Sequence, residues 1–228
     1  MRKMLPLLND EPASSPLWMM AAFAEGKDSL SKLAEDEQAQ LAELMTILPR
    51  PVGELANKLV NVHGDLWDAN CVESDDGTQK LIDFESTSVC GAVQDLVHVS
   101  HPVLVEAYLR EVTGQQPTAD ECEAMLFEAH LAGHIHFFMH RDIFGINGEG
   151  FPTPAGTFIE HARRLVVVVE AVRASKALRH YVVRGCVPEG EPANYSGQRD
   201  LEPEQEARGS AWCWWSAEQL AAEIAKHV

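Results

Sequence analysis

The chain has 228 residues, of which 46% are hydrophobic, and this is enough to build the core of one large domain or two small ones. Its formal net charge is −17, which argues against binding to nucleic acids or to anionic membrane surfaces, because both attract basic proteins. The same charge would draw a cationic substrate toward the protein, although solubility alone also explains it.

The five cysteines are scattered, and none of them forms a C-x-x-C pair. We therefore expect neither a disulfide framework nor a zinc site, and we expect a reducing compartment. The apolar run over residues 4–8 is too short for a secretory signal, and the longest apolar stretch, residues 165–169, cannot span a bilayer. The expectation is a cytoplasmic protein.

The first predicted elements are a helix and a strand. Leucine and methionine recur at helical spacing over residues 33–48, and Pro49 ends that helix. Residues 59–62 form a short apolar strand that leads into a polar loop.

A hairpin and a helix follow. Residues 71–73 and 79–84 have strand composition, and the Asp75-Asp76-Gly77 sequence between them favours a tight turn. Residues 93–109 then predict a helix that Pro102 interrupts.

Two long helices dominate the second half of the chain. Thr118 and Glu121 form a capping box that opens a helix reaching about residue 140. Residues 157–183 predict a second long helix, because the length of the stretch outweighs its β-branched residues.

These elements predict an α+β fold that is mostly helical. We expect one catalytic domain over residues 1–184, a flexible linker rich in proline, glycine and glutamate over residues 185–210, and a C-terminal tryptophan cluster with a helix over residues 211–228.

Residues 63–70 read H-G-D-L-W-D-A-N, and residues 81–85 read L-I-D-F-E. An Asp with an Asn five residues later, followed by a second Asp after the next strand, is the arrangement of the catalytic loop and metal-binding Asp that kinases of the protein-kinase type use for phosphoryl transfer. Asp65 would accept the proton of the attacking hydroxyl, and Gly64 would allow the tight turn before it.

The remaining polar side chains of this pattern suit a magnesium ion. Asn70 and Asp83 supply oxygen ligands, and Mg²⁺ bound with a nucleotide needs few protein ligands because phosphate and water complete its octahedron. Glu85 would share a face with Asp83 if the segment is extended, and it is a third candidate ligand.

Residues 60–97 resemble the aminoglycoside phosphotransferase and choline kinase superfamily, in particular its choline/ethanolamine kinase-like and ecdysteroid kinase-like branches. The resemblance rests on the two motifs above and on G-A-V-Q-D-L over residues 91–96. It implies a protein-kinase-like C-terminal lobe with a short catalytic β-hairpin, and it implies ATP and Mg²⁺ as cofactors. It also implies that His63, Gly64 and Asp95 support the catalytic loop.

Residues 1–62 show no glycine-rich phosphate loop and no strand carrying a nucleotide-binding lysine. The nucleotide-contacting residues are therefore not identified, and the resemblance covers the C-terminal lobe only. One hypothesis is a small-molecule O-phosphotransferase present as its catalytic lobe, with a second chain or further sequence completing the site. The other is a kinase-derived module that binds a metabolite or a protein without turnover. The sequence does not name the acceptor, beyond a small hydroxylated molecule that a cationic group would suit.

Two weaker patterns carry no function. Residues 140–147 also match H-R-D-x-x-x-x-N, but no strand with a second Asp follows them. Four histidines lie within residues 130–140, but helical spacing places them as two pairs that cannot converge on one ion.

Overall fold

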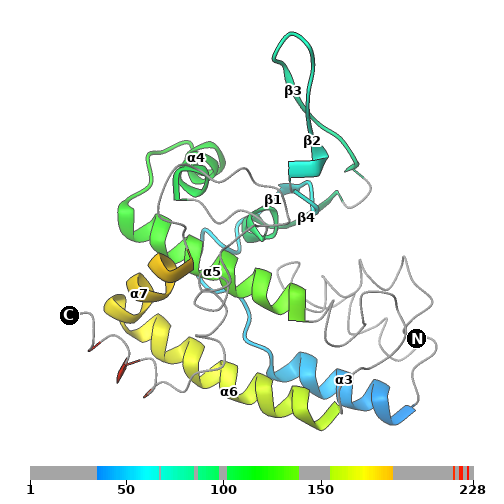
Figure 1. The fold of residues 1–228 in the computed structure, drawn as a ribbon, viewed down its shortest axis with the longest axis vertical. Helices are drawn as coiled ribbons and strands as arrows, with labels where there is room; N and C mark the ends of the chain where they lie inside the picture. The colour runs from blue at the N-terminus through cyan, green and yellow to red at the C-terminus, as the bar shows by residue number, and fades with distance from the viewer. Residues whose placement is uncertain are drawn as a thin grey trace. The chain divides into compact units, whose positions relative to one another are not determined.

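The computed structural model describes residues 35–66, 68–84, 87–97, 102–138 and 155–186, and four isolated positions near the C-terminus (Figure 1). These residues form helices and two small antiparallel sheets, which confirms the predicted α+β, mostly helical class. The chain divides into two compact units. The first comprises residues 1–50, 134–178 and 213–228, and the second comprises residues 51–133 and 179–212.

The first unit contains α3 (Glu35–Ile47) packed against α6 (Ala155–Ala174). The apolar side chains that α3 buries are Leu44 and Met45, and Leu48 just after the helix is buried as well. The prediction of a helix that ends before Pro49 is confirmed. The Arg173 guanidinium of α6 donates a hydrogen bond of 2.6 Å to the carbonyl oxygen of Arg50.

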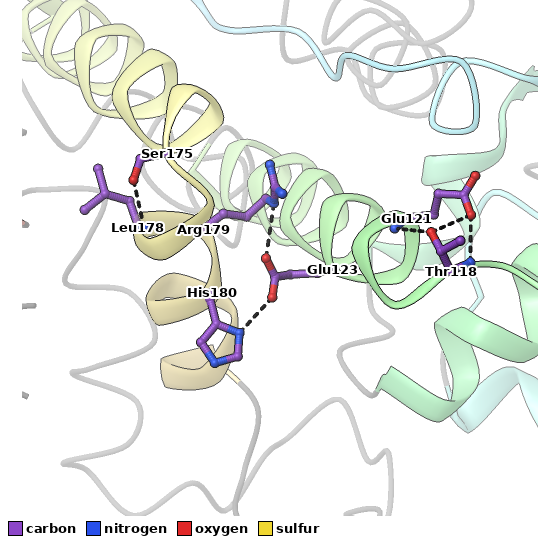
Figure 2. Close-up of polar contacts among 7 residues, drawn as sticks. All are labelled: Thr118, Glu121, Glu123, Ser175, Leu178, Arg179 and His180. Carbon is purple, nitrogen blue, oxygen red and sulfur yellow. Dashed lines mark hydrogen bonds and ion pairs between the residues drawn. The ribbon is translucent and has the colours of Figure 1, made fainter. Parts of the chain in front are cut away.

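The predicted single helix over residues 157–183 is wrong, because the structure has two helices there. Helix α6 ends at Ala174, and after the non-helical Ser175 a second helix, α7 (Lys176–Cys186), begins. The Ser175 hydroxyl oxygen accepts a 3.3 Å hydrogen bond from the Leu178 backbone N–H, as a helix N-cap does (Figure 2). A serine cap satisfies the first turn of a new helix, and apolar periodicity alone does not reveal it.

The second unit contains a two-stranded sheet, and both parts of the motif, residues 63–70 and 81–85, lie in the chain between its two strands. Strand β1 (Leu59–Val62) pairs antiparallel with β4 (Ser88–Gly91), with Leu59 opposite Gly91 and Val62 opposite Ser88. The strand β1 was predicted, but β4 was not. Their pairing brings the two ends of the motif together.

The predicted hairpin is present as β2 (Cys71–Glu73) and β3 (Gln79–Leu81). At its turn, the Gly77 N–H donates to the Ser74 carbonyl at 2.8 Å, and Gly77 has a φ of 80° that glycine adopts readily. The second strand of the hairpin was expected to run to residue 84, and this expectation is wrong. It ends at Leu81, and both strands of the hairpin are exposed.

The helices of the second unit follow. A 3₁₀ helix, η4 (Ala92–Leu96), precedes α4 (Pro102–Thr113), so Pro102 begins a helix and does not interrupt one. Helix α5 (Ala119–Phe138) matches its prediction. Its capping box is confirmed, because the Thr118 backbone N–H donates to Glu121 at 2.7 Å and the Glu121 N–H donates to the Thr118 hydroxyl at 3.2 Å (Figure 2).

The buried apolar side chains of the second unit include residues of η4, α4 and α5. The fully buried ones include Val93, Leu96, Val105, Leu109 and Phe127. Further along α5, Gly133 approaches η4 closely, since a Cβ atom on this residue would lie 2.8 Å from the Val97 carbonyl oxygen.

Glu123 of α5 joins this helix to α7 within the same unit. Its carboxylate accepts from the Arg179 guanidinium at 3.3 Å and lies 2.8 Å from Nδ1 of His180 (Figure 2). Glu123 and Arg179 are mostly buried, so this contact is shielded from solvent.

Several predictions fall outside the described residues. These are the tryptophan cluster, residues 187–210 of the predicted linker and the H-R-D-like sequence over residues 140–147. The first two residues of the predicted linker, 185 and 186, belong to α7 and are helical. The predicted domain boundaries lie beside or within these stretches and stay predictions. None of the helices in the described part of the chain combines the length and apolar character that a membrane crossing requires.

Candidate active site

The loop after β1 carries the first half of the motif. Gly64 has a φ of 83°, which turns the chain at once after the strand. The loop ends in a short 3₁₀ helix, η2 (Asp68–Asn70), which leaves Asn70 buried at its last position. Asn70 Nδ2 donates to the backbone oxygen of Asp65 and to its carboxylate Oδ2, both at 2.9 Å. Asp65 and Asn70 are therefore in direct contact, and the amide holds the half-buried carboxylate in one orientation.

The residue after β3 links this loop to the second half of the motif. The Ile82 backbone N–H donates to the Asn70 carbonyl at 3.0 Å. The Ile82 carbonyl lies 2.8 Å from His63 Nε2, and since a carbonyl can only accept, Nε2 carries the proton. Both main-chain polar groups of Ile82 are thus bound to the loop, and Asp83 follows directly.

His63 is 94% buried, and its ring packs against that of Phe84 with centroids 4.8 Å apart. Its other nitrogen, Nδ1, is buried and has no hydrogen-bond partner among the described residues. The contact with Ile82 is of the loop-supporting kind that the resemblance implies for His63.

Asp83 adopts a left-handed backbone conformation, with a φ of 63°. Its side chain is exposed and makes no hydrogen bond or ion pair with any residue that the structure describes. The segment is therefore not extended at Asp83, and the argument that Glu85 shares its face no longer holds. Glu85 itself lies outside the described residues.

Asp95 lies in η4, and its carboxylate contacts the start of the loop. Oδ1 accepts a 3.1 Å hydrogen bond from the Gly64 N–H, and Oδ2 accepts a 3.2 Å hydrogen bond from the Tyr108 hydroxyl. Burial raises the pKa of this carboxyl above its ordinary value, while the two donors act in the opposite direction. Asp95 bonds the loop backbone, as the resemblance implies.

Asn70 and Asp83 are the described residues that suit a cation. Because Asn70 Nδ2 makes both hydrogen bonds to Asp65, the amide oxygen Oδ1 remains for a ligand. No group of three or more His, Cys, Asp or Glu side chains gathers as a metal site among the described residues. Two oxygen ligands fit Mg²⁺ only when it arrives with phosphate and water.

Sequence reasoning missed Tyr108. The residue lies on the same face of α4 as the buried Val105 and Leu109, so its helical spacing could have placed it toward the core. Its hydrogen bond to Asp95, 13 residues earlier, follows from the packing of α4 and had no sequence signal.

No family model, curated protein or solved structure matches this chain.

Proposed function

We propose that this chain is the catalytic lobe of an ATP-dependent small-molecule O-phosphotransferase of the aminoglycoside phosphotransferase and choline kinase-like type. One observation carries the proposal. Asn70 donates to Asp65, the Ile82 N–H donates to the Asn70 carbonyl, and the Ile82 carbonyl accepts from His63. These bonds hold Asp65, Asn70 and the backbone just before Asp83 in one local structure. Phosphoryl transfer depends mainly on positioning and charge, so such an arrangement suits it.

Asp65 is the candidate base for the acceptor hydroxyl. Its carboxylate Oδ2 is fixed by Asn70, and the backbone just before it is fixed by the bond between Gly64 and Asp95. A base held in one orientation loses little entropy when it takes up a proton from a bound alcohol.

Asn70 Oδ1 and the Asp83 carboxylate would hold Mg²⁺ together with ATP, and Glu85 stays a further candidate. The bound ion supplies positive charge beside the transferred phosphoryl group. The left-handed conformation of Asp83 supports this role, since uncommon backbone conformations at non-glycine residues concentrate at functional sites.

The acceptor in this proposal is a small hydroxylated molecule. The net charge of −17 favours a cationic acceptor by electrostatic steering, and choline, ethanolamine and aminoglycosides are the compounds to test first.

Calorimetric titration of Mg-ATP tests the proposal. The wild-type chain should bind, and Asp83→Ala should bind at least about tenfold more weakly, a loss of roughly 1.4 kcal/mol. Asp75→Ala is the matched control, because it removes an equal charge from the hairpin turn and should leave binding unchanged. Equal binding by the wild type and Asp83→Ala would remove Asp83 from the role.

ADP release with the three acceptors, compared with Asp65→Asn, measures turnover in the same samples. We expect little turnover from this chain alone, because no phosphate-clamping loop or lysine is identified in it, and one lost cation contact costs on the order of a thousandfold. Robust turnover that Asp65→Asn abolishes would contradict that expectation. Absence of Mg-ATP binding by the wild type would instead favour a kinase-derived module that binds a metabolite or a protein.

A further inference from the structure

Two hydrogen bonds connect α4 to the loop that carries Asp65. The Tyr108 hydroxyl donates to Asp95 Oδ2 at 3.2 Å, and Asp95 Oδ1 accepts from the Gly64 N–H at 3.1 Å. Each carboxylate oxygen thus has one of these donors. All three residues belong to the second unit, and Asp95 is 94% buried.

Because Asp95 is buried, hydrogen-bond donors such as the Tyr108 hydroxyl are needed to keep its carboxyl in the charged form. Removing a carboxylate from water favours its neutral form, and burial does raise the pKa of Asp95. A neutral carboxyl is the weaker acceptor for the Gly64 N–H. The Tyr108 hydroxyl opposes this effect, since a donor to the charged form lowers the pKa of the carboxyl.

Tyr108 keeps the proton that it donates to Asp95. Burial, and then the charge of Asp95, raise the pKa of the Tyr108 phenol far above its usual range, so the hydroxyl keeps its proton. The other titratable neighbours are His63, whose backbone N–H also lowers the pKa of Asp95, and Cys90, which lies near Tyr108 on β4.

We infer that Tyr108 is a positioning residue of the candidate active site: its hydroxyl holds the Asp95 carboxylate as the acceptor for the Gly64 N–H, and through it fixes the backbone before Asp65. A role for Tyr108 in catalysis rests on the proposed function, whereas its positioning of the loop does not.

Amide exchange and the pH dependence of the Gly64 resonance, both measured by NMR, test this inference. In Tyr108→Phe, the Gly64 N–H should exchange about five- to tenfold faster than in the wild type, as expected for one weakened hydrogen bond. Tyr181→Phe removes a hydroxyl from α7 and is the matched control, with Gly64 exchange unchanged. Equal exchange in Tyr108→Phe and the wild type would overturn the inference.

The pH profile separates positioning from a loss of packing. The Gly64 amide shift should follow the ionisation of Asp95, and its midpoint should lie at higher pH in Tyr108→Phe because the carboxylate has lost a donor. Asp95→Asn should abolish this transition, which assigns it to Asp95 and not to His63. If Tyr108→Phe does not fold, the wild type still decides, because a Gly64 resonance without a pH transition contradicts the inference.

The two proposals fail separately. Absence of Mg-ATP binding by the wild type removes the proposed function and leaves the Gly64 measurements unaffected. If the exchange rate and the pH dependence of the Gly64 amide are unchanged in Tyr108→Phe, Tyr108 has no positioning role. Mg-ATP binding by the wild type and its loss in Asp83→Ala can still be observed in that case.

Discussion

Among the described residues, Asp83 is the only residue other than glycine that has a positive φ. The left-handed conformation costs an L-residue about 1–2 kcal/mol, and aspartate is one of the few residue types that visits it. Ile82 imposes the geometry, because both of its main-chain groups are bound to the loop before Asp83 begins. Asp83 therefore carries a strained backbone directly after a residue that is hydrogen-bonded to the loop through both of its main-chain polar groups.

This strain predicts an order of stability among variants that lack the carboxylate. Asp83→Gly should be more stable than Asp83→Ala by about 0.5–1 kcal/mol, after the greater chain entropy of unfolded glycine is subtracted. Urea denaturation measures the difference. At Asp75, whose φ is not positive, Asp75→Gly should be no more stable than Asp75→Ala. If the Gly variant were the more stable one at both positions, the explanation by backbone strain would be contradicted.

At the scale of elements, caps decide where the long helices begin. The capping box of Thr118 and Glu121 opens α5, and Ser175 opens α7 where the sequence predicted a continuous helix. Side-chain oxygens satisfy N–H groups that a helix leaves without partners in its first turn.

Thr118→Ala should therefore destabilise the protein by about 1 kcal/mol, measured by denaturation at neutral pH. Thr87→Ala, an exposed threonine outside any helix, should change stability much less. Hydrogen bonds from Thr118 lower the pKa of Glu121, so this carboxylate contributes above its unfolded pKa and its contribution is lost as the pH falls through the folded value. The difference between Thr118→Ala and the wild type should accordingly shrink in acid, and a difference independent of pH would exclude Glu121 from the cap.

For the whole molecule, the charge balance sets a general expectation. A formal net charge of −17 repels itself in the compact state, and salt screens that repulsion. Raising NaCl from about 0.01 to 0.5 M should raise the melting temperature at pH 7. The rise should be much smaller near pH 4.9, the pI of the sequence, and a rise of equal size at both pH values would point to a salt effect other than screening.

Short-range sequence signals account for much of what was correctly predicted. The α3 helix ends before Pro49, the hairpin turns at Gly77, and the capping box opens α5, because each of these signals acts within a few residues. The spacing of Asp65 and Asn70 likewise placed the two residues in one short loop, and their contact needs only that loop.

The remaining features depend on contacts between segments far apart in the chain. The pairing of β1 with β4, the left-handed Asp83 and the bonds from Tyr108 through Asp95 to Gly64 have no local signal. Their partners are chosen by packing across tens of residues, which periodicity and turn chemistry do not encode. The residue types of the candidate site could thus be predicted from the sequence. The backbone conformation of Asp83 and the hydrogen bonds that hold the loop depend on the tertiary structure, because they involve residues that follow β3 or lie in η4 and α4.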